Sequence, residues 1–254
     1  GRDDRFPHLA SELVRLKVDL ILTRGTPAAL AAKNASGTIP IVMAASGAPV
    51  ESGLVASLAR PGGNITGLSS GIGESYPKRV QLLGELLPRF KRMAVILNMG
   101  NPSIPRWWPV IQESARSLGV EAQLLDLRSP ESLPRLFDAA AKQRAEALIV
   151  GFDGITQANL RLIADLAVKH RLPSIYPARA YAQVGGLLAY GSSDALLYHR
   201  AAAFVDKILK GAKPADLPIE QPMRWEFVIN FKTAKALGLT IPPSLLLRAD
   251  QVIE

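Results

Sequence analysis

Short apolar runs alternate with longer amphipathic segments along most of the chain, and this alternation constrains the fold more than any other feature of the sequence. The run "VDLILTRG" at 18–25 follows an amphipathic segment at 8–17, and "MAVILN" at 93–98 is the clearest later example. Continuous apolar runs are typical of strands that are buried on both faces of a parallel sheet, and the segments between them are typical of helices that cover it. The sequence therefore predicts an α/β fold.

The rest of the chain continues this succession of strands and helices. Further strands are predicted at 39–44, 64–70, 121–128, 146–152, 173–177 and 185–193. Helices are predicted at 26–36, 49–59, 75–88, 109–119, 130–144 and 156–170. From residue 212 onward the simple alternation stops, because the tail is rich in proline and has only one short helix-like piece at 232–238. We interpret this tail as a crossing between lobes rather than as a final strand–helix unit.

The number of strand–helix units is too large for one small sheet and suits two doubly wound, Rossmann-like lobes. An eight-fold α/β barrel is the alternative architecture for a chain of 254 residues. A polar break at 88–93, "PRFKRM", and the irregular tail favour two lobes. We predict that the first lobe comprises residues 1–91 with about 192–220, and that the second comprises residues 92–191 with about 221–254.

Composition excludes several classes of function. The absence of cysteine rules out a disulfide framework, thiolate catalysis and a cysteine-ligated metal site. The net charge is +8, but Lys and Arg are spread singly and no basic run is interleaved with aromatic residues, so we expect no binding of nucleic acid. No apolar run approaches the length of a transmembrane helix, and no targeting signal is visible in the sequence.

Catalytic and metal-binding motifs are also missing from the sequence. His8, His170 and His199 fall in helical segments away from the predicted strand ends, so the usual general base is not in place. No G-x-S-x-G motif occurs, and no spacing of His, Asp and Glu suggests a metal site. We therefore predict no catalytic residue, no cofactor and no metal.

The stretch "SLARPGGNITGLSS" at 57–70 has glycines like those of a phosphate-binding loop, but its residues and secondary structure do not follow the order of such a loop. No Lys-Ser/Thr pair follows the second glycine, and the glycines come before a strand rather than after one. We predict that Gly62 and Gly63 adopt positive φ in a turn, with Pro61 ending the helix before it. Ser69 and Ser70, at the far end of the following strand, are the better candidates for contact with a ligand.

Ligands of open α/β sheets bind at the carboxyl ends of the strands, where this chain places small hydroxyls, amides, one carboxylate, one guanidinium and some aromatics. Asn98 is accompanied there by Asn101. The predicted ligand-binding residues are Thr26, Ser46, Ser69, Ser70, Asn98, Asp153, Tyr176 and Arg179.

Each of these residues also has a plain structural interpretation. Thr26 and Asp153 are suitable caps for the helices that follow them, and Arg179 is a suitable partner in a surface ion pair. As ligand contacts, the hydroxyls, the helix N-termini and Arg179 suit a carboxylate, whereas Asp153 suits an ammonium group. Aromatic side chains near the cleft, Trp107 and Trp108 among them, suit a flat apolar body. An amino acid, with aromatic amino acids among the candidates, or a related small organic acid fits this set.

Long ordered motifs give the sequence a family resemblance. The motifs "SLARPGGNITGLSS", "ILKGAKPADLPIEQP" at 208–222 and "FVINFKTAKALGLTIPPSLLLRADQVIE" at 227–254 resemble the ABC-transporter substrate-binding protein family that includes tryptophan- and tyrosine-binding members. The likeness covers nearly the whole chain. It implies a type I periplasmic-binding-protein fold, in which two lobes joined by three crossings close over a small ligand. It also implies a membrane permease as partner, a periplasmic or membrane-anchored extracytoplasmic location, and a monomer.

The resemblance assigns the predicted residues to the two sides of the cleft. Thr26, Ser46, Ser69 and Ser70 would serve the first lobe, and Asn98, Asp153, Tyr176 and Arg179 the second. Family members carry a signal, a strand and a helix before the equivalent of "GRDDRFPHLA", so we expect the first strand of the first lobe to be missing and interpret the sequence as a fragment. The alternatives are a ligand-sensing domain of a transcription regulator on the same fold and, less favoured, an α/β enzyme.

Overall fold

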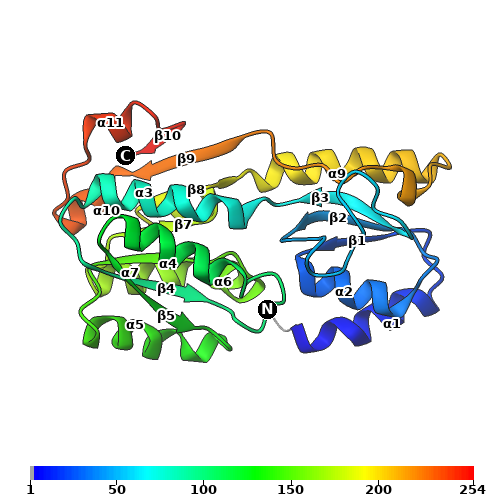
Figure 1. Cartoon of the computed structure of the whole chain (residues 1–254), viewed down its shortest axis with the longest axis horizontal. Helices are drawn as coiled ribbons and strands as arrows, with labels where there is room; N and C mark the ends of the chain where they lie inside the picture. The colour runs from blue at the N-terminus through cyan, green and yellow to red at the C-terminus, as the bar shows by residue number, and fades with distance from the viewer. Residues whose placement is uncertain (1–2) are drawn as a thin grey trace.

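The computed structural model describes residues 3–254 and has two lobes side by side, joined by segments that run between them (Figure 1). Gly1 and Arg2, which the predicted first lobe includes, lie outside the described residues. Each lobe has a central open sheet with helices on both faces, which confirms the predicted α/β class and excludes a closed barrel for this part of the chain.

The first lobe is built on three parallel strands. Their order is β1 (Ile21–Arg24), β2 (Ile41–Ser46) and β3 (Ile65–Ser69). The helices α1 (Phe6–Arg15) and α2 (Thr26–Ala35) lie on one face of this sheet, and α9 (Asp194–Leu209) lies on the other (Figure 1). Within the described residues β1 pairs only with β2, so it forms an edge of the sheet.

Side-chain alternation along β2 explains how both faces of this small sheet are covered. Ile41 and Met43 pack in the cluster that contains the alanines of α2, whereas Val42 and Ala44 pack in the cluster that contains the apolar residues of α9. All four side chains are buried, as expected for a strand covered on both faces.

The second lobe has a seven-stranded sheet in which only the pairing of β8 with β9 is antiparallel. Its strand order is β10 (Gln251–Ile253), β9 (Trp225–Asn230), β8 (Leu188–Ser192), β7 (Ser174–Tyr176), β6 (Ala147–Val150), β4 (Arg92–Leu97) and β5 (Glu121–Asp126). One face packs against α3 (Tyr76–Leu86), α4 (Trp107–Ser117) and α11 (Pro243–Leu246). The other packs against α5 (Leu133–Lys142), α7 (Leu160–Lys169) and α8 (Arg179–Gln183).

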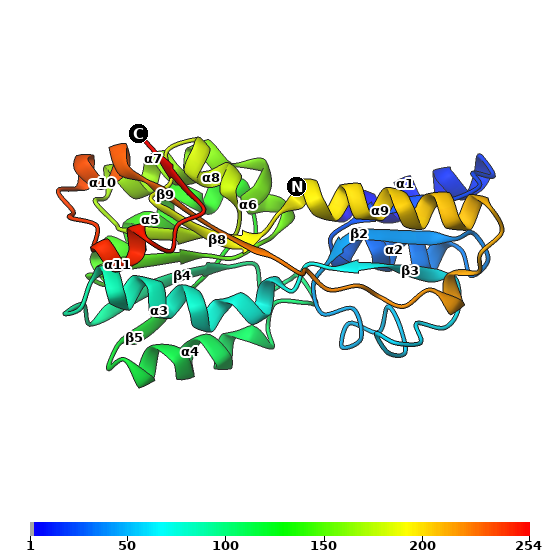
Figure 2. The same ribbon diagram turned by 90° about the horizontal axis from the view of Figure 1, so that it is seen from above.

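Three segments within residues 3–254 connect the lobes (Figure 2). They are residues 70–75, which contain the 3-10 turn η2 (Ile72–Ser75), residues 192–193 and residues 220–224. Hydrogen bonds link these segments to one another. The Ser192 hydroxyl donates to the Ser70 carbonyl at 3.0 Å. The Ser69 N–H donates to the Glu220 carbonyl at 2.8 Å, which ties the end of β3, directly before the first crossing, to the start of the third.

Helix α3 lies in the second lobe, although we predicted that the first lobe extends to residue 91. Its buried residues Tyr76, Val80 and Leu83 pack in one cluster with Met93 and Val95 of β4. The polar break at 88–93 is therefore the turn from α3 into β4 rather than a lobe boundary. From these contacts we propose a first lobe of residues 3–69 and 194–219, and a second lobe of residues 76–191 and 225–254.

The segment 49–59, predicted as a helix, is a series of turns. Ala48 and Gly53 adopt positive φ, and the Pro49 carbonyl accepts hydrogen bonds from both Leu54 and Val55, which interrupts the helical ladder. Gly62 and Gly63 do adopt positive φ, at 69° and 66°, but no helix precedes them.

The tail was predicted to cross between the lobes without a further strand–helix unit, and this is correct only for its first part. Residues 213–224 run from the first lobe to the second, but β9 and α10 (Phe231–Leu237) then form a strand–helix pair. Asn230 caps α10, because its side-chain oxygen accepts the Thr233 N–H at 2.9 Å. The antiparallel pairing of β9 with β8 places this strand outside the parallel pattern used for the prediction.

Candidate ligand-binding site

Two small cavities lie between the lobes, on either side of Ile72. The first, here called the polar cavity, encloses about 50 Å³ and is lined by Thr26 and Gly47 from the first lobe and by Asn101 and Asp153 from the second. The second, here called the Trp107 cavity, encloses about 120 Å³ and is lined by residues that include Glu51, Leu58, Ser69, Arg106 and Trp107.

The turn from β1 into α2 forms the first-lobe wall of the polar cavity. Gly25 adopts φ +82°, so the chain turns directly from the strand into the helix, and Thr26 and Pro27 of the first helical turn line the cavity. The positive end of the α2 dipole and its free N–H groups are therefore at the cavity wall.

Thr26 was predicted as the N-cap of this helix, but Gly25 occupies that position and Thr26 is the first helical residue. The Thr26 hydroxyl donates instead to the Gly47 carbonyl at 2.7 Å, because a carbonyl can only accept. The Ser46 hydroxyl, 3.1 Å from Thr26 Oγ1, must then be the donor of that second bond. Ser46 is fully buried, and this bond helps to hold the Thr26 side chain in place.

Asp153 forms the second-lobe wall and has two structural partners. Its Oδ1 accepts the Ile155 N–H at 2.9 Å in a capping box at the start of α6 (Gly154–Ala158), so its predicted capping role is confirmed. Its Oδ2 accepts the Asn101 side-chain amide at 2.9 Å. The Ser103 hydroxyl in turn donates to Asn101 Oδ1 at 2.9 Å. Asp153 is only 3% exposed, so this carboxylate is fixed and largely desolvated beside the cavity.

Acidic groups set the electrostatics of the polar cavity. Asp3 also lines it, and burial and the nearby Asp153 carboxylate raise the pKa of Asp3 above its ordinary value. Two carboxylates in one cavity favour a cationic group between them. Arg24, which also lines this cavity, donates to Asp194 at 2.7 Å, and its guanidinium carbon lies 4.9 Å from the centre of the Phe152 ring, a contact that crosses from the first lobe to the second.

The Trp107 cavity has an aromatic wall and an ion pair at its edge. A Cβ atom at Gly73 would lie 1.8 Å from the Trp107 ring, so the ring lies directly on this glycine. Arg106 contacts Glu51 of the first lobe at 2.5 Å. Burial acts to raise the pKa of Glu51, but hydrogen bonds from its own backbone and from Arg106, together with the Arg106 charge, hold that pKa below its ordinary value.

The other predicted site residues are divided between the cleft and the core. Ser69 lines the Trp107 cavity, and Ser70 lies in the first crossing, where its hydroxyl accepts the Ile72 N–H. Asn98 lines neither cavity, because its side-chain oxygen accepts the Gly100 N–H at 2.9 Å inside the turn after β4.

Tyr176 and Arg179 are not brought to the cleft. Tyr176 is fully buried in the core, where it stacks on Tyr181 at 4.8 Å and accepts a hydrogen bond from Ser174. Arg179 is exposed at the first position of α8 and lines neither cavity.

Sequence reasoning missed several residues that line the cleft, among them Ser103, Phe152, Arg106 and Glu51. Ser103 follows Asn98 and Asn101 in the polar loop after β4, so extending the search beyond the first residues of each loop would have found it. Glu51 and Arg106 carry no such signal, because their pairing depends on how the two lobes approach each other.

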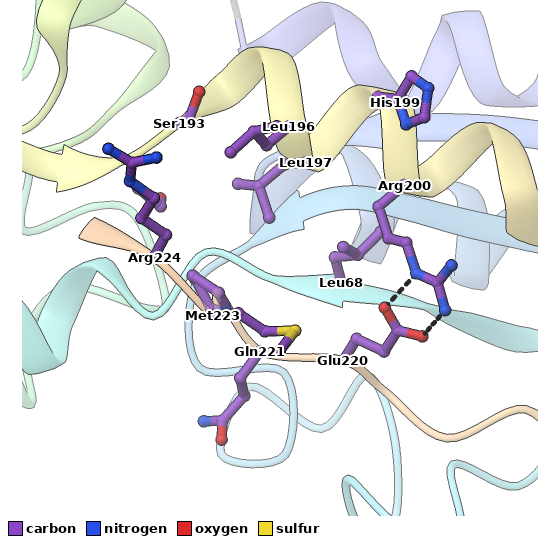
Figure 3. A pocket seen from close by; sticks show the side chains of 12 residues that line it. Leu68, Ser193, Leu196, Leu197, His199, Arg200, Glu220, Gln221, Met223 and Arg224 are labelled. Carbon is purple, nitrogen blue, oxygen red and sulfur yellow. Dashed lines mark hydrogen bonds and ion pairs between the residues drawn. The ribbon is translucent and has the colours of Figure 1, made fainter. Parts of the chain in front are cut away.

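A third cavity, of about 270 Å³, lies outside the cleft between α9 and the crossing at 220–224 (Figure 3). The buried side chains of Leu68 and Leu197 give it an apolar wall, and the fully exposed Met223 also lines it. Arg200 and Glu220 at its edge neutralise each other through two hydrogen bonds of 2.6 Å. The polar cavity, with its buried carboxylate and helix N-terminus, is better equipped to orient a charged ligand.

No group of three or more His, Asp or Glu side chains among residues 3–254 is arranged to hold a metal ion. None of the helices in this part of the chain combines the length and the apolar character needed to span a membrane.

Comparison with known proteins finds a matching family, a curated relative and similar solved structures. The model of the ABC transporter substrate binding protein family matches residues 5–253. A tyrosine-binding protein of Clostridioides difficile strain R20291 is 29% identical over 231 residues, which cover 91% of this chain and 66% of that protein. The chain thus spans less than two thirds of the length of this curated relative.

Solved structures resemble the whole arrangement of the two lobes. The structure of an ABC domain from Streptococcus pneumoniae in complex with L-Trp has a TM-score of 0.91 at 27% identity, over 100% of this chain and 85% of that chain. A conserved domain protein of Vibrio cholerae O1 biovar El Tor strain N16961 also has a TM-score of 0.91 at 27% identity, over 99% of this chain and 84% of that chain. One of these relatives is a tyrosine-binding protein, and another was solved in complex with L-Trp. With the two-lobed type I periplasmic-binding-protein fold and the family match over nearly its whole length, the chain belongs to the ABC transporter substrate-binding protein family.

Proposed function

We propose that this chain is the solute-binding component of an ABC importer, and that it binds an amino acid, an aromatic one in first place, between its two lobes. The proposal rests on one observation: one wall of the polar cavity attracts a positive group, and another wall attracts a negative group. The buried Asp153 carboxylate lies on one wall, and the N-terminus of α2 with Thr26 lies on the other. This pairing suits the ammonium and carboxylate groups of one amino acid.

The Trp107 cavity is the proposed place of the ligand side chain. It adjoins the polar cavity through Ile72, and Leu58, Ile72 and Trp107 give it apolar and aromatic walls. An aromatic ring packed against Trp107 would gain from burial and from ring contact. The tyrosine-binding relative and the structure in complex with L-Trp support an aromatic side chain.

Lobe closure is part of the proposal, because the walls of the polar cavity come from both lobes and leave only a small space between them. About 50 Å³ leaves room for only a few water molecules. The lobes must separate for the ligand to enter, and they close again around it. A ligand that binds the closed form more tightly shifts the population toward it.

The proposed partners and location follow from the family. A membrane permease would recognise the closed form, and the protein would act outside the cytoplasm as a monomer without binding nucleic acid. Neither catalysis nor a cofactor has a role in this scheme.

Titration calorimetry with L-Trp, L-Tyr and L-Phe tests the proposal. Tryptamine, which lacks the carboxylate, and indole-3-propionate, which lacks the ammonium group, are the matched controls. We expect at least one of the three amino acids to bind and both controls to lose most of the affinity, since each leaves one wall of the polar cavity without its partner. Binding of the controls as tight as that of L-Trp, or no binding of any amino acid, would refute the proposal.

A further inference from the structure

Arg79 of α3 is a fully buried cation that the sequence analysis did not single out. It is 0% exposed, and no ion pair connects it to a carboxylate among residues 3–254. Burial lowers the pKa of its guanidinium to about 10, so the side chain remains charged at neutral pH. A buried charge without a counter-ion is strongly unfavourable unless hydrogen bonds satisfy it.

Hydrogen bonds to three separate elements hold this charge. Nε donates to the Tyr190 carbonyl of β8 at 3.1 Å, and Nη1 donates to the Val150 carbonyl of β6 at 3.3 Å. Nη2 donates to Ser75 Oγ at 2.7 Å and to the Ile72 carbonyl at 3.4 Å, both in η2. The guanidinium carbon also lies 4.7 Å from the centre of the Tyr76 ring.

The acceptors of Arg79 connect the ligand site to the hinge. Ile72 belongs to the first crossing and lines both cavities of the cleft. Val150 ends β6, and Asp153 follows it by three residues. Tyr190 precedes the second crossing by two residues, and Ser192 at the start of that crossing donates to Ser70 of the first.

We propose that Arg79 is a positioning residue that couples lobe closure to ligand contact, because one rigid guanidinium fixes the first crossing, β8 close to the second crossing, and the end of β6, three residues before Asp153. The planar fork of arginine reaches acceptors in three directions, and a lysine ammonium at the end of a flexible stem does not reproduce this geometry. The affinity test of this inference rests on the proposed function, because it needs a ligand that binds. The hydrogen-exchange test rests on the structure alone.

Arg79→Lys and Arg79→Met test this role, and a substitution at another fully buried residue is the control. The control is Phe137→Leu, a change at another fully buried residue in the cluster on the opposite face of the second-lobe sheet. We expect both Arg79 variants to bind L-Trp or L-Tyr at least tenfold more weakly than the wild type. Phe137→Leu should lower the free energy of unfolding but leave the dissociation constant within twofold.

Hydrogen exchange of the folded, ligand-free proteins separates this inference from the proposed function. In Arg79→Lys we expect at least tenfold faster exchange confined to residues 70–75, 150–154 and 190–193. A variant that keeps wild-type affinity, or that loses protection uniformly as Phe137→Leu does, would overturn the coupling role. If the wild type binds no amino acid, the proposed function fails, and the exchange pattern still decides the role of Arg79.

Ser75→Ala provides a milder variant that keeps the buried cation. It removes the acceptor of the shortest Arg79 hydrogen bond, at 2.7 Å, and it also removes the bond from Ser75 to the Ile72 carbonyl. We expect a several-fold loss of affinity and faster exchange at residues 70–75. Wild-type affinity and exchange in a folded Ser75→Ala protein would contradict the inference.

Discussion

At the scale of single residues, Asp153 combines the cap of a helix with a wall of the binding cleft. Its Oδ1 is used by the Ile155 N–H and its Oδ2 by the Asn101 amide. These bonds fix the carboxylate in place, and each oxygen retains a lone pair that a ligand ammonium can use. The structural and functional interpretations of Asp153 are therefore compatible, because the capping bond keeps the carboxylate at the wall of the polar cavity.

Asp153→Asn should weaken amino-acid binding without unfolding the protein. Asparagine is as good an N-cap as aspartate, so α6 should remain. The charge that would pair with the ammonium group is lost, and so is the oxygen that accepts the Asn101 amide. Removing one partner of a buried charge pair costs about 2–5 kcal/mol, which is more than a tenfold loss of affinity by calorimetry. Arg179→Ala is the control and should leave the affinity within twofold, since Arg179 is exposed outside the cleft. Equal losses in both variants would show that the site is elsewhere.

Residue positions along the chain were easier to predict than side-chain directions. Thr26, Ser69 and Asp153 reach the cleft because the carboxyl ends of parallel strands face it. Tyr176 also ends a strand, yet its side chain points into the core toward Tyr181. Successive strand residues point to opposite faces, and the sequence alone does not tell which face the last residue of a short strand will occupy.

At the scale of elements, the segment 49–59 lines the cleft as a series of turns, where the sequence predicted a helix. The prediction of a helix used their apolar spacing, but positive φ at Ala48 and Gly53 breaks the segment into turns. The irregular path presents Glu51 to Arg106 at the N-terminal end of α4. The strands, in contrast, were mostly predictable, since continuous apolar runs leave few alternatives for β2, β4 and β6.

The ion pair of Glu51 and Arg106 should make a small, pH-dependent contribution to closure. The pKa of Glu51 is lowered in the closed form, and the part of this shift that is due to Arg106 disappears when the lobes separate. The contribution is therefore complete above the ordinary pKa of 4.5 and is lost as the pH falls below it through the lowered pKa. Both side chains are more than a third exposed, so the pair is worth about 0.5 kcal/mol, roughly a twofold change in affinity.

Glu51→Gln measures this contribution at pH 7. We expect a twofold weaker affinity at low salt and a difference from the wild type that vanishes at high salt, because exposed ion pairs are screened. Below the lowered pKa, where Glu51 is protonated, the wild type and the variant should bind alike. A difference that persists both at high salt and after protonation of Glu51 would contradict the ion-pair explanation.

At the scale of the whole molecule, the two lobes contact each other closely enough for a single methyl group to matter. A Cβ atom at Gly47 in the first lobe would lie 2.9 Å from Ser103 Oγ in the second. Gly47 does not have positive φ, so alanine is compatible with its backbone. In the proposed mechanism this contact is lost when the lobes separate.

Gly47→Ala should therefore weaken ligand binding more than it weakens folding. Forcing an extra methyl group into a packed contact costs about 1 kcal/mol, roughly a fivefold loss of affinity, and the open form avoids this cost. Gly37→Ala is the matched control, because no atom lies within 4 Å of the Cβ position there. Calorimetry and urea unfolding of both variants separate the two effects. A Gly47→Ala protein with unchanged affinity would show that the closed form does not depend on this contact.

Small-angle X-ray scattering during a titration with L-Trp or L-Tyr tests most directly whether the chain binds by closing two lobes. Without ligand, we expect a radius of gyration larger than that of the structure described above, because the polar cavity must open to admit an amino acid. The radius should fall with saturating ligand to the value calculated from this structure, in step with the calorimetric binding curve. An amino acid that binds without any change in the scattering profile would contradict binding by lobe closure.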